Sequence, residues 1–157
     1  MSTHAPGIAF PALLFDMGHN IVFSIADTSD LENDHIKGPG DLIVDRTGAT
    51  WRAAAEIVPL ADHSLVCRVV RTLFRMGDSI MYSPVPVSPI PFTDIIDLII
   101  RNIELDESLW IDYDELLEEL EPSVDSYPLI QAAVETLRSK VLSARDMDQL
   151  IAVVSNL

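Results

Sequence analysis

Histidine and aspartate stand close together at several points of the sequence and raise the question of a metal site. Asp16 lies three residues before His19, and His35 and His63 each follow an aspartate directly. Metal sites usually take two ligands from one side of an element, at H-x-x-x-H, H-E-x-x-H or C-x-x-C spacing. None of these spacings occurs in this sequence. We therefore expect no metal site and no cofactor.

One apolar segment carries an aspartate in a phosphatase-like setting. The segment PALLFDMGHNIVFS, residues 11–24, resembles motif I of haloacid dehalogenase-like phosphatases, an apolar strand that ends in Asp-x-Asp-Gly. The resemblance places Asp16 at the position of that family's nucleophile. Gly18 stands where the family has its general acid, and no convincing magnesium-binding pair follows Lys37. We interpret the segment as a core strand followed by a glycine turn.

Nucleophilic chemistry has little support elsewhere. Cys67 is the single cysteine, so an internal disulfide is excluded. It lies in an apolar-rich stretch, residues 64–75, together with Arg68, Arg71 and Arg75. A cysteine in such a stretch is most often a small core residue. The sequence also lacks G-x-S-x-G and a glycine-rich phosphate loop, so we expect a protein that is not an enzyme.

Carboxylates are concentrated in residues 104–122, ELDESLWIDYDELLEELEP. This stretch holds nine of them and neither lysine nor arginine. The chain as a whole has 25 acidic and 10 basic residues, a formal net charge of −15, and residues 91–126 account for −11 of it. Such a charge disfavours direct binding to nucleic-acid phosphates or to an anionic membrane, since both require positive charge. It favours a basic partner.

The acidic stretch is expected to form a helix from Asp112 to Pro122, and its charges oppose the helix dipole. Glu118, Glu119 and Glu121 crowd the negative C-terminal end, where each costs ~0.3–1 kcal/mol at low salt. No lysine or arginine four residues away offsets this cost. Local stability does not explain these residues. Two interpretations remain: a solvated face, neutralised in part by arginines of the same molecule, or a docking surface.

We favour the docking surface and expect a non-catalytic inhibitor that occludes a basic partner acting on nucleic acid. Small acidic immunity proteins that neutralise nuclease toxins are of this general type, a likeness of size and charge alone. An acidic rim around an aromatic centre is common in fast, tight recognition, and Trp110 or Tyr113 would supply the aromatic ring. The expected partner-binding residues are Asp106, Glu107, Trp110, Asp114, Glu115, Glu118, Glu119 and Glu121.

An acidic secretion or assembly chaperone is the alternative function. It would bind its partner through the isoleucine-rich helix at 93–103, whose apolar face would then be partly exposed. Binding by an inhibitor should weaken steeply as salt rises, whereas binding by such a chaperone should not. A homodimer is left open in either case.

We expect a cytoplasmic protein without a membrane span. The N-terminus, MSTHAPG, lacks the basic and apolar regions of a secretory signal. The apolar segment at 8–26 is long enough to raise the question of a membrane helix. It is interrupted by proline, aspartate, glycine, histidine and asparagine, which a bilayer tolerates poorly.

The order of the expected elements predicts an α+β fold in a single domain, residues 1–157. A β-rich N-terminal part, a hairpin or meander at about 21–58, packs on a C-terminal set of four to five helices. The mixed half covers about 8–60 and the helical half about 64–157. Four prolines make 83–91 an extended segment, either a stiff crossover between the halves or an edge segment.

The N-terminal half contains the clearest strand signals. Residues 21–26 predict a strand. Further on, DLIV and ATWRAAAEIV are separated by DRTG, in which Asp45 and Gly48 have the chemistry of a hairpin turn. Alternation of apolar side chains favours a strand at 49–58, but the run of alanines keeps a helix open there.

The C-terminal half has helical periodicity. Thr93 is the expected cap of the helix at 93–103. Ser126 is the expected cap of a helix at 128–141, with Pro128 in its first turn. The last helix is expected to begin at Ser143, with Asp146 in the capping-box position.

Overall fold

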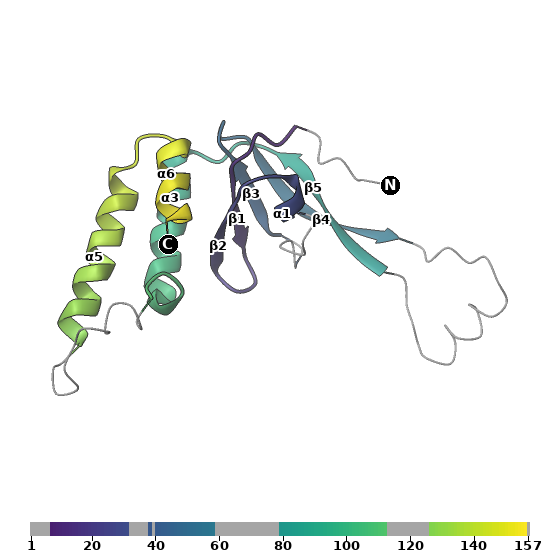
Figure 1. Ribbon diagram of the computed structural model, residues 1–157. Helices are drawn as coiled ribbons and strands as arrows, with labels where there is room; N and C mark the ends of the chain where they lie inside the picture. The colour runs from purple at the N-terminus through teal and green to yellow at the C-terminus, as the bar shows by residue number, and fades with distance from the viewer. Residues whose placement is uncertain (1–6, 32–37, 39, 59–78, 113–125, 157) are drawn as a thin grey trace, which may run out of the picture.

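The computed structural model describes residues 7–31, 38, 40–58, 79–112 and 126–156 (Figure 1). An antiparallel sheet occupies the N-terminal part and helices occupy the C-terminal part, which confirms the α+β class. The apolar-rich stretch at 64–75, which has helical periodicity, lies outside the described residues, and so does the helix expected from Asp112 to Pro122 apart from Asp112 itself, which is not helical. The number of four to five helices and the single domain therefore stay predictions.

The sheet has five antiparallel strands in the order β2-β1-β3-β4-β5. β4 and β5 pair over nine positions and extend as a two-stranded arm beyond the other strands (Figure 1). A strand therefore occupies the segment at 49–58 that the sequence left open. The strands are β1 (Ala12–Asp16), β2 (Ile21–Ile25), β3 (Leu42–Asp45), β4 (Thr50–Val58) and β5 (Ser79–Val87).

β1 is buried on both faces of the sheet. Leu13 and Phe15 belong to the core between the sheet and the helices, and Ala12 and Leu14 belong to a second core on the opposite face. The division follows from the alternation of side chains along a strand. Because both faces are covered, the segment is an uninterrupted apolar run, and the predicted core strand is confirmed.

The hairpin between β3 and β4 is built as its turn residues predict. Asp45 Oδ1 accepts hydrogen bonds from the backbone N–H groups of Thr47 at 2.8 Å and Ala49 at 3.0 Å. Gly48 has a φ of +83°, a conformation that glycine adopts without strain from a Cβ atom. The side chain of Asp45 thus fixes the turn and the register of the two strands.

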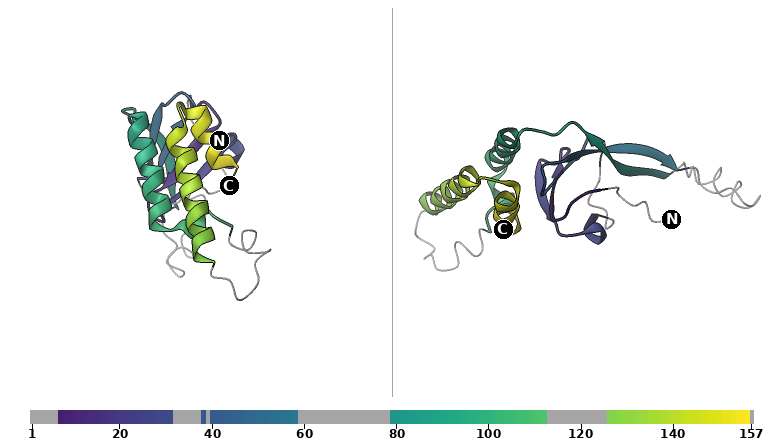
Figure 2. Two further views of the ribbon diagram at one scale, coloured as in Figure 1. Left: turned by 90° about the vertical axis from the view of Figure 1, so that its left-hand side faces the viewer. Right: turned by 90° about the horizontal axis from the view of Figure 1, so that it is seen from above.

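The helices α3, α5 and α6 lie on one side of the sheet, near β2 and away from the β4–β5 arm, whereas the short α1 lies on the other side (Figure 2). Among the described residues, no helix has both the length and the apolar character that crossing a membrane requires. The helical elements are α1 (Thr28–Asp30), α3 (Phe92–Leu105), the 3₁₀ helix η2 (Glu107–Leu109), α5 (Tyr127–Ser143) and α6 (Met147–Ser155).

The α3 helix confirms the predicted apolar face and corrects its cap. Ile95, Ile99 and Ile103 are at most 1% exposed and pack in the core between the sheet and the helices. Thr93 lies inside the helix, because the helix begins at Phe92 and Pro91 precedes it without a side-chain hydrogen bond.

The caps of the two following helices also differ from expectation. Ser126 holds the N-cap position of α5 but makes no side-chain hydrogen bond to the helix. Ser143 ends α5 and does not begin the last helix. Asp146 is the true cap of α6, since its Oδ1 accepts a hydrogen bond from the Gln149 N–H at 2.8 Å.

The proline-rich segment serves two purposes. Residues 83–87 belong to β5, which is the edge strand, and residues 88–91 connect the sheet to α3. An edge is where a sheet tolerates proline, which cannot donate to the ladder. The edge interpretation of this segment is therefore confirmed for residues 83–87.

Truncation of Ile99, one of the core residues of α3, should destabilise the protein strongly. Ile99→Ala removes a side chain that is 0% exposed, and we expect a loss of about 2–5 kcal/mol in the free energy of unfolding. The matched control is Leu142→Ala, since Leu142 is 59% exposed and should change stability little. Urea denaturation measures both. Equal effects would contradict the placement of α3 against the sheet.

Candidate functional site

Exposed carboxylates lie on α3 and on the residues that follow it, next to the three expected partner-binding residues that the structure describes, Asp106, Glu107 and Trp110. We call these exposed carboxylates the acidic surface. Arg101 is the one basic residue in this part of the chain, between Phe92 and Asp112. The members of the acidic surface, all with exposed side chains, are Asp94, Asp97, Glu104, Asp106 and Asp112.

Two members of the acidic surface have defined contacts. Glu104 Oε1 pairs with Arg138 Nη1 of α5 at 2.6 Å. Asp106 caps η2, where its Oδ1 accepts hydrogen bonds from the N–H of Ser108 at 3.1 Å and from the hydroxyl of the same residue. Exposed ion pairs contribute little to stability, with a median of about 0–1 kcal/mol. Neither contact removes its carboxylate from the surface.

Trp110 does not have the exposed position expected of an aromatic anchor. Its side chain is 6% exposed and packs in the core between the sheet and the helices. The indole Nε1 is buried and has no hydrogen-bond partner among the residues that the structure describes. The aromatic ring closes the core after η2, and the expectation that it reaches a partner is wrong. Tyr113, the other candidate for an anchor, lies outside the described residues.

The structure describes three of the eight expected partner-binding residues: Asp106, Glu107 and Trp110. Asp106 is exposed and Glu107 is half-buried, and both lie at η2. The sequence offers three arginines as internal counterions for the acidic stretch. These residues, Arg68, Arg71 and Arg75, lie outside the described residues. So do five of the expected partner-binding residues: Asp114, Glu115, Glu118, Glu119 and Glu121.

Buried carboxylates hold the loops of the sheet; the sequence identified Asp45 as a turn residue but missed the turn-holding role of Asp16 and Asp41. Asp16, Asp41 and Asp45 are between 1% and 5% exposed. Each lies at or beside the end of a strand, where the backbone N–H groups of the following turn lack partners from the sheet. Carboxylates satisfy such groups with strong, charge-assisted hydrogen bonds. The signal in the sequence is an aspartate at either end of an apolar run: Asp16 and Asp45 end one, and Asp41 precedes one.

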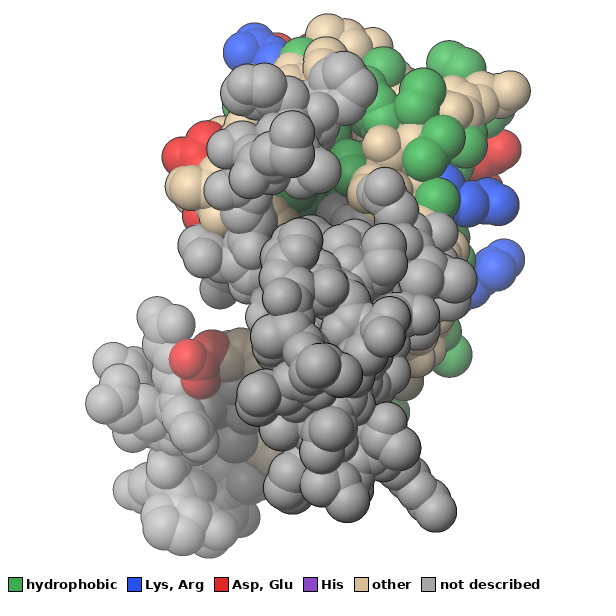
Figure 3. Space-filling view, turned by 90° about the vertical axis from the view of Figure 1, so that its right-hand side faces the viewer, with side chains coloured by type: hydrophobic (Ala, Val, Ile, Leu, Met, Phe, Trp, Pro, Cys, Tyr) green, Lys and Arg blue, Asp and Glu red, His purple; other side chains and the backbone are tan. Residues whose placement is uncertain are grey.

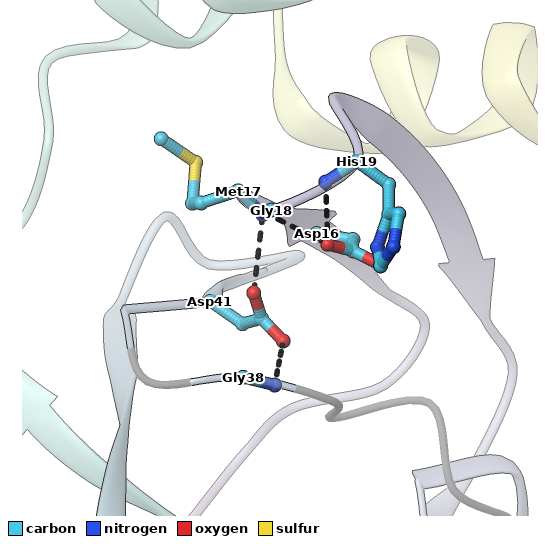
Figure 4. Close-up of polar contacts among 6 residues, drawn as sticks. All are labelled: Asp16, Met17, Gly18, His19, Gly38 and Asp41. Carbon is cyan, nitrogen blue, oxygen red and sulfur yellow. Dashed lines mark hydrogen bonds and ion pairs between the residues drawn. The ribbon is translucent and has the colours of Figure 1, made fainter.

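Asp16 and Asp41 together fix the turn between β1 and β2 (Figure 4). Asp16 Oδ1 accepts from the N–H groups of Gly18 and His19, both at 3.0 Å. Asp41 Oδ1 accepts from the Met17 N–H, and its Oδ2 accepts from the Gly38 N–H, both at 3.1 Å. Two carboxylates from different loops thus hold one turn.

Asp16 also forms a pair with a histidine. Its Oδ2 lies 2.8 Å from Nδ1 of His19, whose side chain is 67% exposed. Burial acts to raise the pKa of the Asp16 carboxyl, but hydrogen bonds from the His19 side chain and from the N–H groups of His19 and Gly18 outweigh it. The pKa of Asp16 therefore lies below its ordinary value.

The geometry gives Asp16 a structural task. A nucleophilic carboxylate must reach a substrate, yet this side chain is buried and both oxygens accept hydrogen bonds from its own turn.

In the described part of the chain, no group of three or more His, Cys, Asp or Glu side chains comes together to hold a metal ion. Comparison of the chain with family models, curated proteins and solved structures finds no match.

Replacement of Asp16 should make the free energy of unfolding less dependent on pH in the acidic range. Asp16→Asn removes the charge that accepts three hydrogen bonds, and we expect a loss of about 1–3 kcal/mol at neutral pH. Because the folded pKa is lowered, the stabilisation is present above the ordinary value of 3.8 and disappears as the pH falls through the folded pKa.

The stabilities of the two proteins should therefore converge only as the pH falls below 3.8 and through the lowered pKa of Asp16 in the folded state. Urea denaturation across a pH series measures the difference between them. Asp97→Asn is the control, since Asp97 is exposed on α3. A difference between wild type and Asp16→Asn that is constant with pH would show that the charge of Asp16 contributes nothing.

Proposed function

We propose that the protein is a non-catalytic inhibitor that binds a basic, nucleic-acid-acting partner, such as a nuclease toxin, and covers its cationic surface. The observation that carries the proposal is the exposure of the carboxylates of the acidic surface in a region with one basic residue of its own. A concentrated negative field attracts a positively charged partner and orients it before contact. The proposal includes a cytoplasmic location.

Inhibition would occur by occlusion. The carboxylates from Asp106 to Glu121 would meet the lysines and arginines that the partner otherwise offers to phosphates. Nucleic acid and anionic membranes are not proposed as ligands, because the net charge of −15 repels both. The inhibitor would need no cofactor and no chemical step.

Apolar contact would come from residues beside the carboxylates. Leu105 is 60% exposed and Leu109 is 48% exposed, and they lie at the ends of α3 and η2. Exposed leucines within an acidic rim support an interface with a desolvated centre, which is where binding energy concentrates. They replace Trp110, which is buried in the core.

The chaperone alternative has less support from the same elements. It requires an apolar face on the helix at 93–103, but Ile95, Ile99 and Ile103 are buried against the core. The other apolar residues of that helix, Ile96, Leu98 and Ile100, are only partly exposed. Binding that persists undiminished at high salt would favour the chaperone over the inhibitor.

Reversal of charge on the acidic stretch should abolish capture of the partner. Tagged wild-type protein is used to capture proteins from its own host's lysate at low and at high salt, and the captured proteins are identified by mass spectrometry. We expect a basic protein at low salt and a steep loss at high salt. Glu118→Lys/Glu119→Lys/Glu121→Lys should lose it.

A matched pair of single variants separates the location of charge from its amount. Glu119→Lys and Glu135→Lys change the net charge equally, and Glu135 is exposed on α5, outside residues 104–122 in the sequence. Glu119→Lys should reduce capture several-fold, and Glu135→Lys should not. Retention of the partner by the triple variant, or no basic protein at low salt, would contradict the proposal.

A further inference from the structure

The outer edge of β5 carries two prolines at alternate positions. β5 ends the strand order and pairs with β4 through all nine of its residues. Pro84 lies opposite Ala53, and Pro86 lies opposite Trp51. Alternate residues of a strand direct their N–H and C=O groups to the same side, so the two prolines face one direction.

Backbone hydrogen bonds of β4 show which direction this is. The Ala53 N–H donates to the Asp41 carbonyl at 2.8 Å, and the Ala53 carbonyl accepts from the Gly40 N–H at 3.2 Å. Both groups of Ala53 therefore point toward β3 and away from β5. Pro84 opposite it belongs to a pair without mutual hydrogen bonds, so its nitrogen and carbonyl point out from the sheet.

The same geometry holds two residues further along. Trp51 has the orientation of Ala53, so Pro86 also faces outward. At these two positions the edge presents carbonyl acceptors and no N–H donors. A strand that paired there would find neither of the donors that an ordinary edge supplies. We infer that Pro84 and Pro86 close this edge of the sheet to a strand from a second copy of the chain or from another protein.

The arm is a place where such closure matters. Val85 and Val87 are 44% and 37% exposed on β5. Figure 3 shows hydrophobic side chains gathered at the upper right of the end from which the arm projects. A long edge strand with exposed apolar side chains is a template for pairing with other chains, and proline is one of the ways in which proteins prevent it.

The opposite edge strand of the sheet is β2, which has a helix against it. β2 lies against α6, and the hydroxyl of Ser155 donates to Ser24 Oγ at 2.7 Å. A helix beside an edge hinders the approach of another strand. Among the described residues, no helix lies beside the outer edge of the arm, and two prolines stand there instead.

Restoration of the missing donors tests the inference. The full chain with Pro84→Thr/Pro86→Thr regains two outward N–H groups and keeps side chains suited to a strand. Light scattering coupled to size exclusion measures its mass over a range of concentrations. We expect a mass at least about twice that of wild type at the same concentration.

Two controls separate the donors from other effects of substitution. Val85→Thr lies between the prolines on the same strand, but its N–H already faces β4, so no outward donor is added. Pro89→Thr adds an N–H outside the strand. Both should keep the wild-type mass. A folded double variant with the wild-type mass at every concentration would overturn the inference.

Failure of the double variant to fold would still leave a decisive comparison. Pro84→Thr alone restores one outward donor and should raise the mass above that of Val85→Thr. Equal masses for these two variants would overturn the inference as well. The experiment requires no partner, so its outcome is independent of the proposed function.

Discussion

Burial of β1 on both faces is the constraint on which the remaining structure depends. Leu13 and Phe15 bind the helical layer to the sheet, and Ala12 and Leu14 bind the segments on the other face. A strand enclosed in this way can carry no charge until it ends. Asp16 is the first residue of β1 that can be polar, and its carboxylate is then used to hold the turn that leads to β2.

Two groups of carboxylates stand out among the described residues. Asp16, Asp41 and Asp45, at or beside strand ends, are buried and accept hydrogen bonds from backbone N–H groups, so they contribute to the fold. The carboxylates of the acidic surface are exposed, with Glu104 paired to a single arginine. The buried carboxylates are explained by the stability that they give to the turns. The exposed carboxylates have no such explanation and support the proposed interaction with a basic partner.

Local patterns predicted the elements better than their ends or their functional surface. Alternation and turn chemistry identified β2, β3 and the hairpin at Asp45, because those signals act within a few residues. Caps were less predictable: Thr93 has the right chemistry, but the helix begins at Phe92, so Pro91 occupies the N-cap position and Thr93 lies inside the helix. Trp110 was misplaced because an aromatic beside carboxylates can face either core or partner, and tertiary packing decides between them.

We propose that the carboxylates of the acidic stretch repel one another in the free protein and are neutralised when a basic partner binds. Removal of three charges with Glu118→Gln/Glu119→Gln/Glu121→Gln tests this directly, through the free energy of unfolding at low salt. The account predicts a more stable protein, by ~0.3–1 kcal/mol for each charge removed. A less stable protein would mean that arginines of the same molecule already neutralise these side chains, and it would contradict the account.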